Sequence, residues 1–380
     1  MKQQLLLITF ALAAAGAEDK PEILSLPADV VAAQAPTLAS GSDGRAWLAY
    51  AAPATGAGAQ GMEIWICSWK KGEKALSKPI LVAKEPSLMA GMHRGPQVAT
   101  WGKSLAVSWI NGKDLRCARS DDGAVWKDPV TVNAAPGSAS EGLHAMAATS
   151  DGQLWCCWVG PGSHLLTARS KDGGASFENM SPVQKGTVCP CCRPSLASGA
   201  GGGLTVMFRN DLITEKTEKT PQSESRDLYV ADLDLKEGHF GEGCKLGKGT
   251  WKIASCPMDG GGCAFGKTLV TVWRRDRMIL ATLDDTTSER TLGTGKDPAV
   301  ATLASGAALA VWTDKDAIQM LRLGGSQGAE PAKVSAPEKG AKQGLPAVAP
   351  LSGGYLVAWE ETPADAKPPT LKARWIPASP

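Results

Sequence analysis

Residues 298–312 read Pro298-Ala299-Val300-Ala301, then a turn with Ser305-Gly306, then Leu309-Ala310-Val311-Trp312. The same phrase occurs seven times: a Pro-x-[Leu/Val]-Ala opening, a glycine-containing turn, and an apolar segment that ends in an aromatic residue. Short apolar segments bounded by turn residues are typical of β-strands. The seven terminal aromatics are Tyr50, Trp109, Trp158, Phe208, Trp273, Trp312 and Trp359.

Successive terminal aromatics lie 39 to 65 residues apart, which gives a repeat of about 50 residues with several short strands in each copy. This period predicts an all-β fold, a β-propeller of four-stranded blades. The repeat count predicts seven blades, and six remain the alternative if the first phrase forms an outer hairpin. Residues Glu22 to Leu26 resemble the outer strand that the last repeat lacks, so we expect them to close the ring. The polar insert from Ile213 to Ser225 is expected to be a mobile loop.

The first 17 residues have the pattern of an export signal, with Lys2, an apolar run from Leu5 to Ala14, and the small residues Ala15-Gly16-Ala17. We therefore expect residues 18–380 to form a single propeller domain that is periplasmic or secreted. No other segment approaches the length of about 20 apolar residues that a membrane-spanning helix needs. A net charge of +2 with interspersed acids and bases argues against nucleic acid or a membrane surface as partner.

Two repeats carry a second phrase with the pattern Ser-x-Asp-x-Gly-x-x-[Trp/Phe]. Ser170 to Phe177 fits it fully, and Ser120 to Trp126 is one residue short. These phrases resemble the Asp-boxes, or BNR repeats, of the sialidase superfamily. The blocks Glu141 to His144, Cys189 to Pro194 and Trp251 to Gly262 are similar to a bacterial subgroup of exported sialidase-like proteins with a Cys-x-Cys-Cys block. The resemblance covers nearly the whole mature chain and implies architecture more than chemistry.

The resemblance also implies an anion site. Met92-His93-Arg94-Gly95-Pro96 resembles the arginine motif of the first sialidase blade, and sialidases hold a substrate carboxylate with three arginines. Arg94 matches the first of these, and Arg209 and Arg274 are candidates for the others, with Arg193 and Arg226 as rivals. The family's catalytic groups are a tyrosine nucleophile, a glutamate and an aspartate. Glu141 and Asp114 are the candidate catalytic carboxylates, whereas none of the three tyrosines is expected at the mouth.

The topology of a propeller gives an independent reason to look at the same residues. Loops that lead into the innermost strand and loops that follow the second strand open on one face, so their side chains gather at one mouth. Arginine forks bind carboxylates bidentately, and several around one pocket predict an anionic ligand such as a sugar acid or a glycan. The candidate ligand-binding residues are His93, Arg94, His144, Arg193, Arg209 and Arg274.

Ten cysteines in an exported chain favour disulfides, but four of them are expected at this mouth: Cys189, Cys191, Cys192 and Cys256. Three interpretations stay open. A disulfide from Cys189 or Cys191 to Cys256 or Cys263 would join two blades. A thiolate site, with help from His93 and His144, would bind Cu(I) or Zn(II). A free or redox-active thiol is the third. The sequence thus leaves three functional classes: a glycan-binding or glycan-hydrolysing propeller, a metal-binding propeller, and a scaffold for a protein partner.

Overall fold

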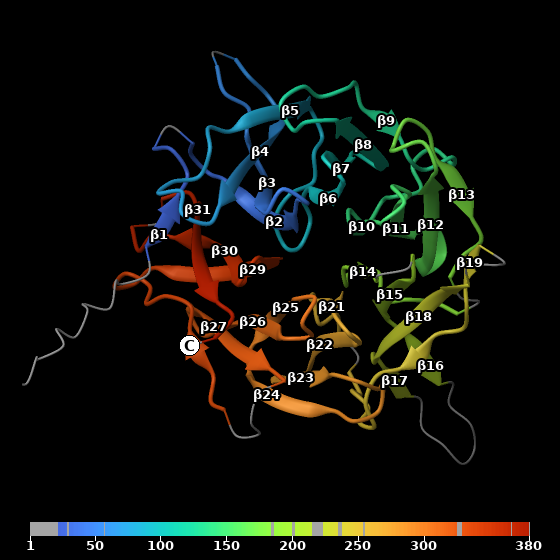
Figure 1. Ribbon diagram of the computed structural model, residues 1–380. Coiled ribbons are helices and arrows are strands. Elements are labelled where there is room, and N and C mark those ends of the chain that lie inside the picture. Colours follow the sequence, from blue (N-terminus) through green and yellow to red (C-terminus); the bar gives the residue numbers. More distant parts are fainter. Residues whose placement is uncertain are drawn as a thin grey trace, which may run out of the picture.

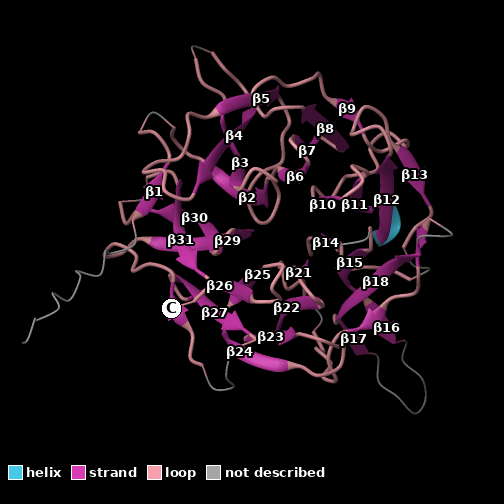
Figure 2. Cartoon of the chain, in the orientation of Figure 1, coloured by secondary structure: helices cyan, strands magenta, loops and turns pink. Residues whose placement is uncertain are grey.

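The computed structural model is a ring of seven antiparallel blades around a central axis (Figure 1). It describes residues 22–28, 30–56, 58–183, 186–199, 202–214, 223–234, 238–253, 255–324, 329–365 and 367–379. The expected export signal at residues 1–17 lies outside the described residues. Within these ranges the only helix is a single 3-10 turn, Pro161–Ser163, and everything else is strand or loop (Figure 2). The prediction of an all-β propeller with seven blades is confirmed, and the six-blade alternative is excluded.

Each blade is a meander of four strands, and consecutive blades follow one another around the ring. Blade one consists of β2 Gln34–Ser40, β3 Arg45–Pro53, β4 Met62–Lys70 and β5 Ile80–Glu85. Blade two consists of β6 Gln97–Trp101, β7 Ser104–Asn111, β8 Asp114–Ser120 and β9 Val130–Thr131. Blade three consists of β10 His144–Ala148, β11 Leu154–Gly160, β12 His164–Ser170 and β13 Glu178–Met180. Blade four consists of β14 Ser195–Ser198, β15 Leu204–Arg209, β18 Leu228–Asp234 and β19 His239–Phe240, and a further short strand, β20 Cys244–Lys245, also pairs with β18. Blade five consists of β21 Gly261–Phe265, β22 Leu269–Arg275, β23 Met278–Thr282 and β24 Arg290–Thr294. Blades six and seven consist of β25 Lys296–Thr302, β26 Ala308–Asp314, β27 Ala317–Leu323, β28 Ala332–Lys333; and β29 Lys342–Leu351, β30 Gly354–Thr362, β31 Thr370–Pro377.

The N-terminal strand β1, Ile23–Ser25, completes the seventh blade. It pairs antiparallel with β31, in the register Ile23 to Arg374 and Ser25 to Lys372. The first and last blades are thereby joined through one sheet, and the edge of β31 is covered. The expected closure by residues 22–26 is confirmed.

The seven terminal aromatics of the repeated phrase build the core. All are at most 2 % exposed, and each packs in the apolar layer between its own blade and the preceding one. Flat rings suit a layer between two facing sheets because they fill its width without breaking the strand pairing. Indole N–H groups also bond the preceding blade, as Trp109 does to Glu85 at 2.9 Å and Trp312 to the Thr294 carbonyl at 2.9 Å.

The alanine of the opening phrase lies at the axis. The first strands of all seven blades converge there and line a central channel. An alanine from each blade lines the central channel: Ala39, Ala99, Ala147, Ala197, Ala264, Ala301 and Ala349.

The insert in blade four is only partly a loop. Leu212–Thr214 (β16) and Ser223–Ser225 (β17) pair as a two-stranded hairpin, which corrects the expectation of a loop from Ile213 to Ser225. Residues 215–222, between these strands, lie outside the described ones. The Ser-x-Asp phrases form turns as expected from their residue types. The hydroxyl of Ser170 accepts the Gly174 N–H at 2.7 Å, and Asp172 accepts the Ser176 N–H at 2.9 Å.

Candidate ligand-binding site at the axial mouth

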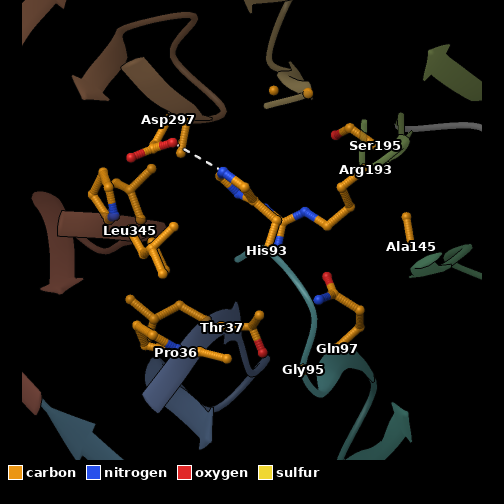
Figure 3. A pocket seen from close by; sticks show the side chains of 18 of the residues that line it. Pro36, Thr37, His93, Gly95, Gln97, Ala145, Arg193, Ser195, Asp297 and Leu345 are labelled. Atoms are coloured by element: carbon orange, nitrogen blue, oxygen red, sulfur yellow. Dashed lines mark hydrogen bonds and ion pairs between the residues drawn. The ribbon is translucent and has the colours of Figure 1, made fainter. Parts of the chain in front are cut away.

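A polar cavity of about 200 Å³ opens at one end of the channel (Figure 3). Every blade contributes the residues that begin its first strand. These are Ala35 to Leu38, His93 to Val98, Ala145 and Met146, Arg193 to Leu196, Gly260 to Cys263, Asp297 to Val300, and Leu345 to Val348. The cavity is therefore a product of the repeat itself, and what it binds depends on which side chains stand at these positions.

In three blades, the residue before the repeat proline has a left-handed backbone conformation and lines this cavity. Ala35, Asp297 and Leu345 have φ values of 56°, 56° and 50°, and a bulge interrupts the strand register at each of these places. Left-handed backbone is costly for residues other than glycine, although aspartate tolerates it better than most. Such costs concentrate at functional sites. Here they aim the residue before the proline at the axis.

The glycine run of blade five serves close packing. A Cβ on Gly260 would lie 2.1 Å from the Arg193 carbonyl oxygen, and one on Gly261 would lie 2.3 Å from the Met207 methyl group. Only glycine lets the chain pass so near blade four at the mouth.

His93 and Asp297 are hydrogen-bonded to each other at the wall of the cavity. The His93 Nε2 lies 2.9 Å from the Asp297 Oδ1, and both side chains are largely buried (Figure 3). Burial by itself would raise the pKa of Asp297. The His93 hydrogen bond and the nearby charges of His93 and Lys296 outweigh burial, so the pKa lies below its ordinary value. The sequence analysis assigned Asp297 no binding or catalytic role, yet its place before Pro298 is the same repeat position that Arg193 holds before Pro194.

Arg193 brings a positive charge to the cavity with no direct partner. Its side chain is half-buried and faces the cavity from blade four, with His93 between it and Asp297 in the view of Figure 3. Within the described part of the chain, no hydrogen bond or ion pair within 4 Å engages its guanidinium. Enclosure by the blades lowers the pKa of Arg193, and the charge of Asp297 offsets this only in part.

Arg94 also lines the cavity. Its Nε donates to the Glu141 carbonyl at 2.9 Å, which fixes the orientation of the fork. The terminal nitrogens of the guanidinium have no hydrogen-bond partner among the residues that the structure describes. Arg94 and Arg193 are thus two guanidinium groups that can still donate to a ligand.

Arg209 and Arg274 do not line the cavity, because Asp259 holds both. Arg209 lies 3.5 Å from one Asp259 oxygen and Arg274 lies 3.2 Å from the other. The side chains of Arg209 and Asp259 are each 1 % exposed, and Arg209 also donates to the carbonyls of Arg226 and Arg274. Both guanidinium groups stack near the Trp251 ring, at 5.2 and 5.4 Å from its centroid. These two arginines join blades four and five.

His144 is a buried core residue at the start of β10. Its Nε2 lies 3.0 Å from the Ser108 hydroxyl of the neighbouring blade, and it is 1 % exposed. Burial, reinforced by the charge of Arg193, lowers the pKa of His144 to about 3, so the ring is neutral at physiological pH.

Neither candidate catalytic carboxylate lines the cavity. Glu141 lies in the loop before β10 and contributes its backbone carbonyl to Arg94. Asp114 accepts hydrogen bonds from the Asn133 amide at 2.8 Å and the Gly137 N–H at 2.7 Å, which brace a loop of blade two. These bonds lower the pKa of Asp114, opposite to what a general acid requires. Tyr50, Tyr229 and Tyr355 are all described, and none lines the cavity.

The four mouth cysteines come together between blades four and five. Cys191 and Cys256 form a disulfide with a Cα–Cα distance of 6.4 Å. The sulfur atoms of Cys189, Cys191, Cys192 and Cys256 all lie within 4.8 Å of one another. No histidine belongs to this group, because His93 and His144 are engaged by Asp297 and Ser108.

Comparison with known proteins finds no matching family model and no matching curated protein. Among solved structures, a leech intramolecular trans-sialidase complexed with 2,7-anhydro-Neu5Ac is similar, with a TM-score of 0.53 and 10% identity over 96% of this chain and 71% of that one. A polysaccharide lyase of family PL25, an ulvan lyase, gives a TM-score of 0.51 and 11% identity over 92% and 94% of the two chains. A protein of unknown function from Dyadobacter fermentans gives 0.50 and 13% over 93% and 97%.

At such low identities the likeness shows the fold alone. The chain is a seven-bladed propeller with a polar cavity at its axial mouth, and its fold is similar to that of the leech trans-sialidase. No helix within the described ranges is long and apolar enough to cross a membrane.

Proposed function

We propose that this protein is an exported propeller that binds a small anion at its axial mouth, most simply a sugar acid or the acidic end of a glycan. The observation that carries the proposal is the Arg193 guanidinium, which faces the cavity without a hydrogen-bonded carboxylate in the described chain. A guanidinium that lacks a partner can donate to a ligand carboxylate, and such charge-assisted pairs are stronger than neutral hydrogen bonds.

The other lining groups suit a sugar. Thr37, Gln97 and Ser195 bring hydroxyl and amide groups into the same cavity (Figure 3). Arg94 adds a second guanidinium group to the same cavity. A sugar acid could therefore be bound through its carboxylate and a few of its hydroxyl groups. A trans-sialidase and an ulvan lyase share the propeller fold, which supports a glycan as the source of the anion.

Hydrolysis is the second candidate activity. Asp297 lines the cavity, and Glu360, which does not line it, lies close enough to Asp297 and His93 for their charges to act on it. Burial raises the pKa of Glu360, whose Oε1 accepts the Ala35 N–H at 2.5 Å, whereas the pKa of Asp297 is lowered. A glycosidase needs two carboxyl groups in opposite protonation states. With no tyrosine at the cavity, any hydrolysis would depend on these two groups in place of the family's tyrosine nucleophile.

A binding experiment tests the first proposal. The mature protein would be titrated calorimetrically with sialic acid, glucuronate and their neutral parent sugars, and applied to a glycan array. We expect the acidic ligands alone to bind, and Arg193→Met to weaken binding at least about tenfold, the loss of one charge-assisted hydrogen bond. Arg290→Met removes the same charge from the outer strand β24 and should bind normally. Equal binding of neutral and acidic sugars, or no binding at all, would contradict the anion site.

A turnover assay separates binding from hydrolysis. Fluorogenic sialosides and glucuronides would be incubated with the wild type, Glu360→Gln and Arg193→Met. Release of the fluorophore by the wild type that is lost in Glu360→Gln would establish a hydrolase. Binding without release leaves a lectin-like module, and the absence of both favours a protein partner at the propeller face.

A further inference from the structure

The cysteine cluster is formed by two loops that lie far apart in the sequence. Cys189, Cys191 and Cys192 lie in the loop that leads into β14, and Cys256 lies in the loop that leads into β21. Consecutive blades are neighbours in the ring, so these loops meet at the mouth (Figure 1). Cys189 and Cys192 are buried, and Cys191 and Cys256 are half-buried.

Four sulfur ligands at this spacing suit a tetrahedral metal ion. With metal–sulfur bonds of about 2.3 Å, the sulfurs of a tetrahedral site lie about 3.8 Å apart. The sulfur atoms here lie within 4.8 Å of one another, and the Sγ atoms of Cys189 and Cys191 are 3.4 Å apart. Small rotations of the side chains would therefore reach the tetrahedral arrangement once the Cys191–Cys256 bond is open.

One of the four sulfur atoms accepts a hydrogen bond from a charged side chain. The Arg226 Nη1 donates to the Cys189 Sγ at 3.0 Å, and Arg226 is itself held by Glu224 and Asp211. Hydrogen bonds to ligand sulfurs and buried surroundings are the usual supports of thiolate metal sites.

We propose that Cys189, Cys191, Cys192 and Cys256 bind one thiophilic d¹⁰ metal ion, Zn(II) or Cu(I), when the Cys191–Cys256 disulfide is reduced. The disulfide and the metal are then alternative cross-links between blades four and five. A phosphine reduces the disulfide to two thiols. In this reaction the phosphine takes up one oxygen atom from water and becomes the phosphine oxide, and the two hydrogen atoms of that water go to the thiols. Metal binding releases the protons of the thiols that coordinate.

The test uses the full mature protein in both redox states. Protein reduced anaerobically with a phosphine, and protein left oxidised, would each be loaded with Zn(II) or Cu(I), freed of excess ion over a competing chelator, and assayed by elemental analysis. We expect about one ion per chain in the reduced protein and none in the oxidised protein. Co(II) loading of the reduced protein should give the thiolate-to-metal charge-transfer bands and intense visible bands of a tetrahedral sulfur site.

The variants can be checked for folding. A Cys189→Ser, Cys192→Ser double variant leaves the disulfide in place, so its melting temperature in the oxidised state shows whether it folds. It should lose the metal after reduction, while Cys244→Ser, at the exposed cysteine of β20, should keep it. Reduced wild type that retains neither ion, equal loading of oxidised protein, or metal retained by the double variant would each overturn the proposal. The ion that remains in stoichiometric amount identifies the metal.

Discussion

Asp259 determines which arginines of the mouth are available to a ligand. Its two oxygens hold Arg209 and Arg274, and the Asp297 backbone N–H also approaches one of them at 3.3 Å. Burial raises the pKa of Asp259 although both arginines oppose this. Arg193 and Arg94 lie beyond its reach and face the cavity instead. Contact with the Asp259 carboxylate therefore distinguishes the arginines that join the blades from those that can bind a ligand.

Removing that carboxylate should cost stability. Asp259→Ala would leave Arg209 buried without its ion-pair partner, and we expect a loss of about 3–5 kcal/mol in the free energy of unfolding. Urea denaturation followed by tryptophan fluorescence measures it. Asp128→Ala, at an exposed position, should change the free energy of unfolding by less than about 0.5 kcal/mol. Equal stability of the two variants would show that Asp259 is not a structural partner of Arg209.

His144 should make the fold sensitive to acid. Its pKa is about 3 in the folded protein, below the ordinary value of 6.5, because burial disfavours the charged ring. Between these pH values the unfolded chain binds a proton that the folded chain does not, so stability falls as pH falls. The contribution reaches about 1.4 kcal/mol for each pH unit. His144→Gln should flatten this dependence between pH 6 and about 4, within the pKa gap.

Urea midpoints of wild type and His144→Gln across that range test the effect. His164→Gln, at the start of β12 in the same blade, is the control and should retain the wild-type slope. A slope unchanged in His144→Gln would mean that other groups cause the acid sensitivity.

The sequence could indicate the mouth but not the pairing of its charges. Loop positions at strand ends placed His93, Arg94 and Arg193 on one face, and the cavity contains all three. Arg209 satisfies the same rule, but a partner 50 residues away removes it from the cavity, and no local pattern encodes that contact. The same rule places Asp297 at the mouth, because it precedes the repeat proline as Arg193 does, but its pairing with His93 could not be predicted.

At the scale of elements, the repeated phrase specifies the blade because its signals are local. The alanine lines the central channel, the turn glycine reverses the chain, and the terminal aromatic fills the layer against the preceding blade. Blade five shows that the proline opening is not essential for a blade. There the Gly260–Gly262 run replaces it, and the first strand still forms. The β16–β17 hairpin was missed because each strand has only three residues, and neither Leu212-Ile213-Thr214 nor Ser223-Glu224-Ser225 shows the alternation of a buried strand.

Trp312 offers a test of the inter-blade layers. Its ring is buried between blades five and six, and its indole N–H bonds the Thr294 carbonyl at 2.9 Å. Trp312→Ala should lower the free energy of unfolding by about 3–5 kcal/mol, and Trp312→Phe should lower it by less. Chemical denaturation of both variants gives the comparison. A loss of under about 1 kcal/mol in the alanine variant would show that this layer tolerates a cavity.

At the scale of the whole molecule, seven layers close a ring, and each depends on two blades. One of them, between blades seven and one, combines residues from the two ends of the chain, including Leu24, Tyr50 and Leu356. The strand β1 therefore holds the two ends of the chain together. It contributes three residues to the sheet of blade seven and an apolar contact to the layer between blades seven and one. Long-range closure of this kind makes the stability of the ring depend on a very short segment.

Leu24 should be the critical residue of that segment. It is 4% exposed, whereas its neighbour Ile23 is 40% exposed. Leu24→Ala should cost about 2–5 kcal/mol and Ile23→Ala less than about 0.5 kcal/mol. Deleting residues 22–26 should do more, because it bares the edge of β31, and an open strand edge pairs with other chains. We expect the deletion variant to melt earlier and to elute as larger species in size-exclusion chromatography with light scattering. If it stays monomeric with an unchanged melting temperature, the ring is held by its other six layers and β1 is dispensable.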